Sequence, residues 1–256
     1  MIPDVLHIGP IPLHLFGICL AIAFLVAGRV ASSELARAGY DPEAAGSALT
    51  AAVIGGLLGA RLWLVVEDWS AFLRDPVGLL LTGSGFVFYG GLVGGTLGVA
   101  WVLRRHRIPF VQGADACAPA VVVGQAIGRI GCQLSGDGDW GRVTDLPWGM
   151  RYPHAVVGWP YENPEITVHP TPIYEMLAYF LIFIYLRRQR AQAPPPGTTF
   201  GTYLILASSA RFLVEFVRIN PPVLMGLTAA QLTSLALVLL GALVLRLGRR
   251  WQPAAA

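Results

Sequence analysis

The chain alternates between long apolar stretches and short polar connections. A helix needs about 20 mostly apolar residues to cross about 30 Å of hydrocarbon. By that criterion the pattern predicts seven membrane-spanning helices. The third stretch is interrupted by Gly83, Ser84 and Gly85, which predicts a broken or re-entrant segment, and the fifth stretch is short. The predicted spans lie near 11–31, 46–66, 77–103, 114–134, 171–186, 198–217 and 227–247.

Composition agrees with this pattern and excludes a separate soluble domain. Apolar side chains make up 55% of the 256 residues and charged ones only 13%, whereas about a quarter of residues are charged in soluble domains. We therefore expect an all-α, polytopic membrane protein in which residues 1–256 form a single integral membrane domain. The segment from about 135 to 170 is polar, and we expect it to form a small loop or cap on the outer face. Its aromatic residues are typical of the headgroup level. They are Trp140, Trp148, Tyr152, Trp159 and Tyr161.

Arginine placement predicts the orientation. All 18 basic residues are Arg, and the net charge of +3 is too small and too dispersed to indicate a nucleic-acid partner. Positive residues concentrate in cytoplasmic loops, and here they follow every odd-numbered span. The pattern predicts an external N-terminus and a cytoplasmic C-terminus. The residues on the predicted cytoplasmic side are Arg29, Arg37, Arg104, Arg105, Arg107, Arg187, Arg188, Arg190, Arg246, Arg249 and Arg250, and those opposite are Arg74, Arg142, Arg151 and Arg218.

The cysteines, the N-terminal segment and the glycine pairs allow three further predictions. The cysteines Cys19, Cys117 and Cys132 are odd in number and have no metal-ligand spacing, so we expect no disulfide, no metal and no other cofactor. No basic residue precedes the first apolar stretch, so a cleaved signal peptide is not expected. Pairs of glycines four residues apart predict close helix contacts. These pairs are Gly55 with Gly59, Gly90 with Gly94, and Gly91 with Gly95.

Ionisable residues within apolar spans are the candidates for function, because a charge is costly in a membrane. Arg129 lies in the fourth span, and Arg211 and Glu215 share one face of the sixth at positions i and i+4. Glu175 lies one turn into the fifth span. One interpretation is an ion-paired structural network among these four residues. The other is an anion pocket in which Arg129 and Arg211 bind a phosphate, with the two glutamates orienting the guanidinium groups.

The residues GRIGCQLSGDGDWGR at 128–142 resemble the GRxGNFxNxExxG signature of bacterial prolipoprotein diacylglyceryl transferases. The resemblance continues in order over nearly the whole chain. The further segments are HLFG at 14–17, GARLW at 59–63, GFVFYGGLVGG at 85–95, DLPWGM at 145–150, HPTPIYE at 169–175, ARFLVEFVR at 210–218 and AQLTS around Gln231.

The resemblance implies transfer of the diacylglyceryl group of phosphatidylglycerol to the lipobox cysteine of a preprolipoprotein signal peptide. The products would be a thioether and glycerol 1-phosphate, and the enzyme would lie in the bacterial cytoplasmic membrane. Arg129 matches the signature Arg, and Arg211 with Glu215 matches the family pair in the sixth span, so these residues would hold the phosphate. We expect the matching segments to supply further substrate-binding residues. They are His14, Arg61, His169, Tyr174 and Glu175.

The chain departs from the family pattern at the position expected to activate the thiol. Tyr89 stands where the family has His, and an ordinary Tyr, with a pKa near 10, is a weak base at neutral pH. Three explanations compete. The field of the two arginines activates the thiol with Tyr89 as a hydrogen-bond donor; or another base, such as His14, His169 or Asp137, takes the proton; or the chain is a divergent paralogue.

Other departures lie beside the signature. Phe16 replaces a family Tyr, and Cys132 and Ser135 replace two Asn. The signature is one residue longer here, so that either Asp137, counted forward from Arg129, or Asp139, counted back from Gly141, stands for the family Glu. A lipid transporter or scramblase is the alternative from another class, since broken helices and intramembrane charge are its usual signs.

Overall fold

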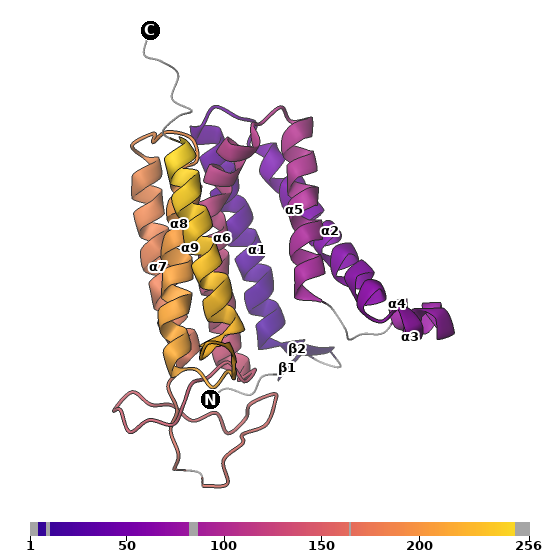
Figure 1. The fold of residues 1–256 in the computed structure, drawn as a ribbon, viewed down its shortest axis with the longest axis vertical. Helices are drawn as coiled ribbons and strands as arrows, with labels where there is room; N and C mark the ends of the chain where they lie inside the picture. Colours follow the sequence, from indigo (N-terminus) through magenta and orange to yellow (C-terminus); the bar gives the residue numbers. More distant parts are fainter. Residues whose placement is uncertain (1–4, 9–10, 82–86, 164, 249–256) are drawn as a thin grey trace. The chain divides into compact units, whose positions relative to one another are not determined.

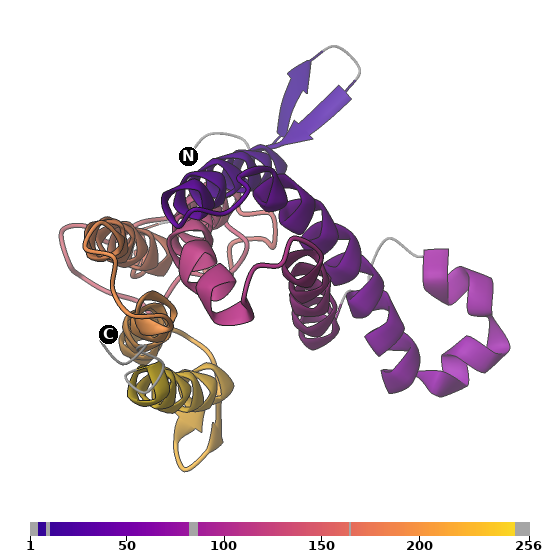
Figure 2. The same cartoon turned by 90° about the horizontal axis from the view of Figure 1, so that it is seen from above.

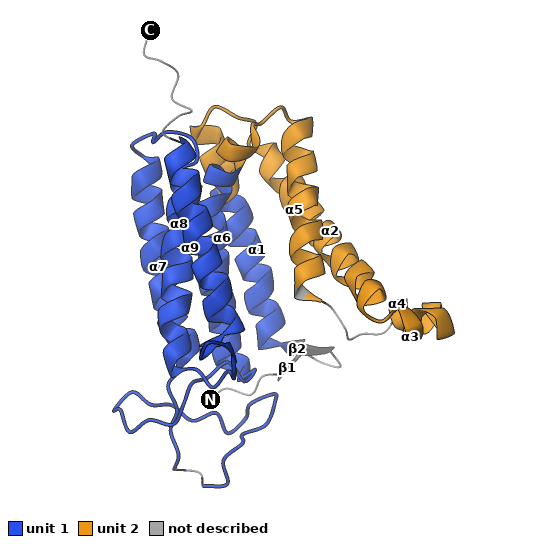
Figure 3. Ribbon diagram, in the orientation of Figure 1, with its two compact units in different colours: residues 1–30, 114–256 blue, residues 31–113 orange. Residues whose placement is uncertain are grey.

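The computed structural model describes residues 5–8, 11–81, 87–163 and 165–248. The described chain is mostly helical and divides into two compact units (Figure 3). Unit 1 comprises residues 1–30 and 114–256, and unit 2 comprises residues 31–113. The boundaries fall within α1 (Leu15–Arg37) and within the first turn of α6 (Phe110–Ser135).

Unit 1 contains most of the helices in Figure 1. Besides α6 and the first part of α1, it holds α7 (Thr171–Arg190), α8 (Thr198–Val214), the short 3-10 helix η1 (Glu215–Val217) and α9 (Ala229–Gly248). Its two small antiparallel sheets are hairpins. The first pairs β1 (Val5–Ile8) with β2 (Ile11–His14), and the second pairs β3 (Pro222–Leu224) with β4 (Leu227–Thr228).

The core of unit 1 lies where α6, α7 and α8 meet. Small side chains such as Ala118 and Ala126 of α6 let the large buried residues Tyr179 and Leu186 of α7 approach closely. Asp115, buried near the start of α6, accepts hydrogen bonds from the backbone N–H groups of Gly197 and Phe200, at 2.6 and 2.7 Å. Because the first N–H groups of a helix have no partner within it, this carboxylate caps α8 from a neighbouring helix.

Unit 2 is built on the antiparallel pair α2 (Glu43–Glu67) and α5 (Phe88–Arg105), with the short helices α3 (Trp69–Arg74) and α4 (Pro76–Leu81) between them. A Cβ atom added at Gly59 would collide with the carbonyl oxygen of Gly90, and one at Gly55 with that of Gly94. The backbones are therefore in direct contact, which confirms the close approach predicted from the glycine spacing.

Within the described residues, five helices are long and apolar enough to cross a membrane: α1, α2, α6, α8 extended to Val217, and α9. Large apolar side chains on them, such as Leu25, Val66 and Leu239, are exposed, as expected where lipid is the solvent. The chain is a multi-pass membrane protein. Helices α5 and α7 coincide with the third and fifth predicted spans but are not among these five, so the count of seven stays a prediction.

Several predicted details need correction. The fold is not strictly all-α, because it includes two small sheets. Residues 11–14 belong to β2 rather than to the first helix, which begins at Leu15, since their backbone groups pair with β1. The third span is divided between α4 and α5, and the predicted interruption at Gly83–Gly85 lies outside the described residues.

Residues 136–163 and 165–170 form a cap at one end of unit 1 (Figure 1). Its centre is aromatic: the rings of Trp140 and Tyr152 stack with centroids 5.1 Å apart, and Trp159 packs on both. The Tyr152 hydroxyl donates to Gln133 Oε1 of α6 at 2.8 Å, which ties the cap to the helices. Its predicted place on the outer face stays a prediction.

Candidate active site

Six charged side chains at the cap end of unit 1 form a closed ring of ion pairs, in which arginines and carboxylates alternate. We call it the arginine ring. It joins residues from α6, the cap, α7, α8 and η1. In order around the ring, its members are Arg129, Glu175, Arg211, Glu215, Arg218 and Asp139.

Glu175 joins the two arginines that the sequence singled out. It lies in the first turns of α7, a helix that begins with Thr171 and Pro172, and proline is well suited to a helix start because its missing N–H has no partner there. Oε2 of Glu175 pairs with Nε of Arg129 at 2.8 Å, and Oε1 pairs with Nη1 of Arg211 at 3.2 Å. Arg129 and Arg211 therefore flank a single, fully buried carboxylate.

Glu215 continues the ring on the other side of Arg211. Its Oε2 lies 2.8 Å from Nη2 of Arg211, as the i, i+4 spacing predicted, and 3.4 Å from Nε of Arg218. The other oxygen, Oε1, accepts hydrogen bonds from Nδ2 of Asn220 at 2.6 Å and from Oγ1 of Thr228 at 2.9 Å. Glu215 is thus buried with a partner on each oxygen, which is what a buried charge requires.

Asp139 closes the ring from the cap. Its Oδ2 pairs with Arg129, its Oδ1 lies 2.5 Å from Nη2 of Arg218, and its carbonyl oxygen accepts from Nη1 of Arg218 at 2.8 Å. Backbone hydrogen bonds hold this stretch in place: Gly141 N donates to the carbonyl of His169 and Arg142 N to that of Val217, both at 2.8 Å. Of the two aspartates left open by the sequence, Asp139 is the one that pairs with the arginines.

The ring is electrically balanced, but its charges are not equally covered. The side chains of Glu175 and Glu215 are fully buried, and that of Arg218 is 6% exposed. Those of Arg129 and Arg211 each keep 21% of their surface exposed, and that of Asp139, which pairs with Arg129 and Arg218, keeps 27%. The uncovered parts of these two cations can take up an anion, and the guanidinium fork matches a phosphate.

The carboxyls of Asp137 and Asp139 differ although they are two residues apart. Burial alone would raise the pKa of Asp139, but the guanidinium groups of Arg218 and Arg129 outweigh it and hold that pKa below its ordinary value. Burial raises the pKa of Asp137, which is not a member of the arginine ring and accepts a hydrogen bond from the backbone N–H of Asp139 at 3.2 Å. Asp137 therefore takes up a proton more readily than Asp139.

Cys132, Asp137 and Asp139 offer a thiol and two carboxylates within 4.8 Å of one another. This spacing would suit a metal ion, but both oxygens of Asp139 already pair with guanidinium groups. Arg129, whose Nη1 lies 3.6 Å from the Cys132 sulfur, would also repel a cation. The donor set therefore does not fit a metal.

His169 and Tyr174 lie beside the arginine ring and are not part of it. They line an apolar pocket of about 470 Å³, where the Tyr174 hydroxyl lies 3.2 Å from Nδ1 of His169 and accepts a hydrogen bond from Nε1 of Trp148 at 2.8 Å. The pocket adjoins the ring along the chain because Tyr174 precedes Glu175. The remaining lining residues are Leu146, Trp148, Leu213, Val214 and Val217.

The other predicted residues are not in the ring. His14 is exposed at the end of β2. Arg61 and Tyr89 belong to unit 2: Nη1 of Arg61 donates to the carbonyl of Leu79 at 3.4 Å, and Tyr89 is 56% exposed in the first turn of α5. The proposed roles of all three stay predictions.

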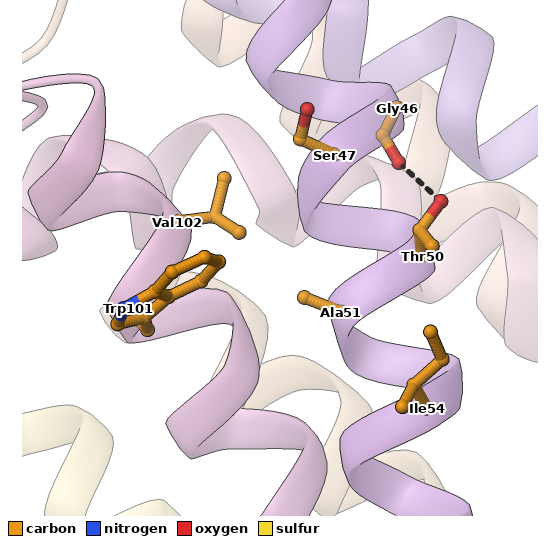
Figure 4. Close-up of a pocket in the computed structure, with 7 residues that line it drawn as sticks. All are labelled: Gly46, Ser47, Thr50, Ala51, Ile54, Trp101 and Val102. Carbon is orange, nitrogen blue, oxygen red and sulfur yellow. Dashed lines mark hydrogen bonds between the residues drawn. The ribbon is translucent and has the colours of Figure 1, made fainter.

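Unit 2 also has a pocket of its own, of about 670 Å³, between α2 and α5 (Figure 4). None of its lining residues is ionisable, and the Thr50 hydroxyl is bonded to the carbonyl of Gly46 at 3.0 Å. It therefore offers no acid, base or charge for catalysis. Its lining residues are Gly46, Ser47, Thr50, Ala51, Ile54, Trp101 and Val102.

Arg218 is the ring member that the sequence did not assign to the site, although it extends the helix face of Arg211 and Glu215. It was placed among the arginines of the outer face rather than in the site. A local signal was present, because Arg218 follows Glu215 by three residues and Arg211 by seven, and so lies near the same helix face. Its pairing with Asp139 had no such signal, because the two residues are far apart along the chain.

Comparisons with known proteins agree with the signature. The family model described as prolipoprotein diacylglyceryl transferase matches residues 3–247. Three relatives are named phosphatidylglycerol–prolipoprotein diacylglyceryl transferase. The one from Aeromonas hydrophila is 32% identical over 255 residues, covering 95% of this chain and 89% of the relative. That from Photobacterium profundum is 30% identical over 261 residues (98% and 94%), and that from Clostridium tetani 28% over 250 residues (97% and 98%). This chain therefore belongs to the prolipoprotein diacylglyceryl transferase family.

Proposed function

We propose that this protein transfers the diacylglyceryl group of phosphatidylglycerol to the thiol of the lipobox cysteine of a preprolipoprotein. The family match supports this reaction over lipid transport or scrambling. The observation that carries it is the arrangement of Arg129 and Arg211, two partly exposed guanidinium groups on either side of the buried carboxylate of Glu175. Such a pair is suited to a lipid phosphate.

The reaction places negative charge on that phosphate. The cysteine sulfur attacks the glycerol carbon of the diacylglyceryl group, a carbon–sulfur bond forms, and the carbon–oxygen bond to the phosphate breaks. The electron pair of the broken bond leaves with glycerol 1-phosphate, and the thiol gives up its proton. Arg129 and Arg211 would stabilise the developing charge on the leaving phosphate, because preorganised donors interact most strongly where charge develops.

The carboxylates of the ring would act on the arginines and not on the lipid. Glu175 and Glu215 each pair with one nitrogen of the Arg211 guanidinium group, and Asp139 pairs with Arg129. An anionic substrate would be repelled by free carboxylates, but Glu175 and Glu215 are fully buried. Asp139 is 27% exposed, and both of its carboxylate oxygens are paired with arginines. The ring would therefore fix the orientation of the cations before the lipid binds.

The base that receives the thiol proton stays open between several residues. Asp137 is the candidate beside the ring, and burial raises the pKa of its carboxyl, which makes it a stronger base than an ordinary aspartate. His169 lines the neighbouring apolar pocket. His14 is the third candidate base. In the alternative without such a base, the field of Arg129 and Arg211 activates the thiol and Tyr89 donates a hydrogen bond.

We further propose seven spans, in which α5 and α7 cross the membrane together with the five helices named above. Arginines at the ends of the odd-numbered spans support an external N-terminus, an external cap and a cytoplasmic C-terminus. On this topology the arginine ring lies toward the outer face of the bacterial cytoplasmic membrane, where both substrates would reach it.

The test is an assay with purified protein, phosphatidylglycerol and a lipobox peptide, with mass spectrometry of the peptide and coupled detection of glycerol phosphate. Arg129→Ala should lower the rate by about 10²–10³-fold, because it removes a donor to the developing charge. Arg151→Ala is the matched control, since Arg151 is an exposed cap arginine paired with Glu165. A folded Arg129→Ala protein with full activity would refute the phosphate assignment.

A further inference from the structure

The β3–β4 hairpin presents an apolar tip that no other described residue of unit 1 covers. Val223 and Leu224 are exposed, and Met225 is 91% exposed. Between Pro221 and Leu227 the chain has no polar side chain. Figure 2 shows the gold hairpin extending from α9 away from α7 and α8, so the tip points away from the helices of its own unit.

The turn itself is unfavourable for methionine. Met225 and Gly226 both have positive φ angles, 50° and 76°, in a two-residue hairpin connection. That conformation favours Asn, Asp or Gly at the first position, and a bulky side chain there is strained. In water, methionine at this position has two costs, backbone strain and the exposure of apolar surface. In hydrocarbon the cost of exposing apolar surface disappears.

The place of the hairpin along the chain identifies what surrounds it. It connects two of the membrane-crossing helices, Thr198–Val217 and Ala229–Gly248. A connection as short as residues 218–228 stays at the membrane surface, because both of its ends are held there. Lipid is therefore the apolar environment within its reach.

The base of the hairpin is polar and is tied to the arginine ring. Thr228 and Gln231 form a reciprocal cap at the start of α9: Thr228 N donates to Oε1 of Gln231 at 3.0 Å, and Gln231 N donates to Oγ1 of Thr228 at 3.2 Å. The same Thr228 hydroxyl donates to Oε1 of Glu215. The side-chain amide of Asn220, which precedes β3, donates to the same oxygen.

We propose that the β3–β4 hairpin is a membrane-surface anchor. Its tip, Val223–Met225, inserts into the leaflet next to the arginine ring, and its base holds Glu215 in position against Arg211. Insertion does not depend on the reaction catalysed. The effect of the base on lipid binding rests on the proposed function.

Insertion is tested by attaching a fluorophore to Met225→Cys and reconstituting the protein in vesicles of phosphatidylglycerol and phosphatidylcholine. Quenching by a nitroxide on the upper acyl chain is compared with quenching by aqueous iodide. Glu165→Cys is the control, because its side chain is 79% exposed in the cap. The unsubstituted protein, with Cys19, Cys117 and Cys132, is labelled in parallel for background.

We expect the label at 225 to be quenched several-fold more by the lipid nitroxide than the label at 165, and several-fold less by iodide. Equal access of iodide to both labels would overturn the proposal. Protection of the label at 225 from both quenchers would overturn it as well, because the tip would then be covered by protein, such as a second copy of the chain.

The hydrogen bond from Thr228 to Glu215 is tested with two variants. Thr228→Val keeps the shape and removes the hydroxyl, and Thr228→Ser keeps the hydroxyl. We expect the KM for phosphatidylglycerol to rise several-fold in Thr228→Val and to stay near the original in Thr228→Ser, with kcat little changed. A purely structural role would reduce the amount of folded protein without moving KM, and an unchanged KM overturns this part. If the protein transfers no lipid at all, the quenching result still decides insertion.

Discussion

Unit 1 and unit 2 join apolar helices in opposite ways. In unit 2, glycines of α2 and α5 bring two backbones into contact without any charge. In unit 1, the arginine ring places six charges among helices that also share an apolar core. The glycine contact shows that this chain can hold helices together without ion pairs. Since buried ion pairs contribute little net stability over well-packed apolar groups, packing alone does not explain the ring.

The exposure of the two arginines sharpens the difference. A ring that served only to join helices would have no need to leave its cations open. Arg129 and Arg211 each retain 21% exposure while their shared carboxylate is covered. This asymmetry favours the anion pocket over the structural network, and the following variants separate the contributions.

The largest effect is expected when the ring is broken at its shared carboxylate. Glu175→Gln keeps the shape but leaves Arg129 and Arg211 without their common counter-charge. Removing one partner of a buried ion pair costs about 3–5 kcal/mol, so the free energy of unfolding should fall by that order. Thermal unfolding in lipid or detergent measures it.

The control for this variant is Glu165→Gln, which removes an exposed ion pair with Arg151. Exposed pairs contribute about 1 kcal/mol at most, so little change is expected. If both variants unfold at the same temperature, the ring has no particular role in stability.

A smaller effect is expected in the glycine contact. Gly59→Ala places a Cβ against the carbonyl of Gly90 and should destabilise the protein by about 1–3 kcal/mol, as overpacking does. Gly46→Ala in the same helix is the matched control, because a Cβ there has nothing within 4 Å. Alanine is the better helix former by about 1 kcal/mol, so this control should be neutral or stabilised. Equal losses in both would contradict the prediction, because the loss would then not come from contact with the carbonyl of Gly90.

The smallest effect concerns pH. The folded pKa of Asp139 is lower than its unfolded value, so its contribution to stability is complete above the unfolded pKa, near 3.9, and is lost as the pH falls through the folded pKa. The stability difference between the original protein and Asp139→Asn should therefore be constant near neutral pH and shrink in acid. Unfolding measured across pH checks this, and a difference that grows in acid would contradict the ion pairs of Asp139.

What could be predicted follows local periodicity. The spans follow from the length of the apolar stretches. The glycine pairs and the pairing of Arg211 with Glu215 depend on spacings of four residues, which helical geometry turns directly into neighbours. Thr228 and Gln231 form their cap for the same reason. The strands Val5–Ile8 and Ile11–His14 were missed because an apolar run does not by itself distinguish a strand from the start of a helix.

The arginine ring was only partly predictable. Arg129, Arg211, Glu175 and Glu215 stood out because charge is rare in apolar spans. The choice of Asp139 over Asp137 could not be made, since counting from either end of the signature gave a different residue. It depends on how the cap returns to α7 and η1 through the backbone bonds of Gly141 and Arg142.

The sequence by itself determined that this is a helical membrane protein, which helix faces approach closely, and which charges are too costly to be incidental. Only the tertiary structure decided that these charges close into a ring, that Arg218 completes it, and that the β3–β4 hairpin rests on Glu215. The physical reason is distance along the chain. Helical neighbours are set by the backbone repeat, whereas a contact between the cap, α6 and the end of α8 exists only after all of them have folded against one another.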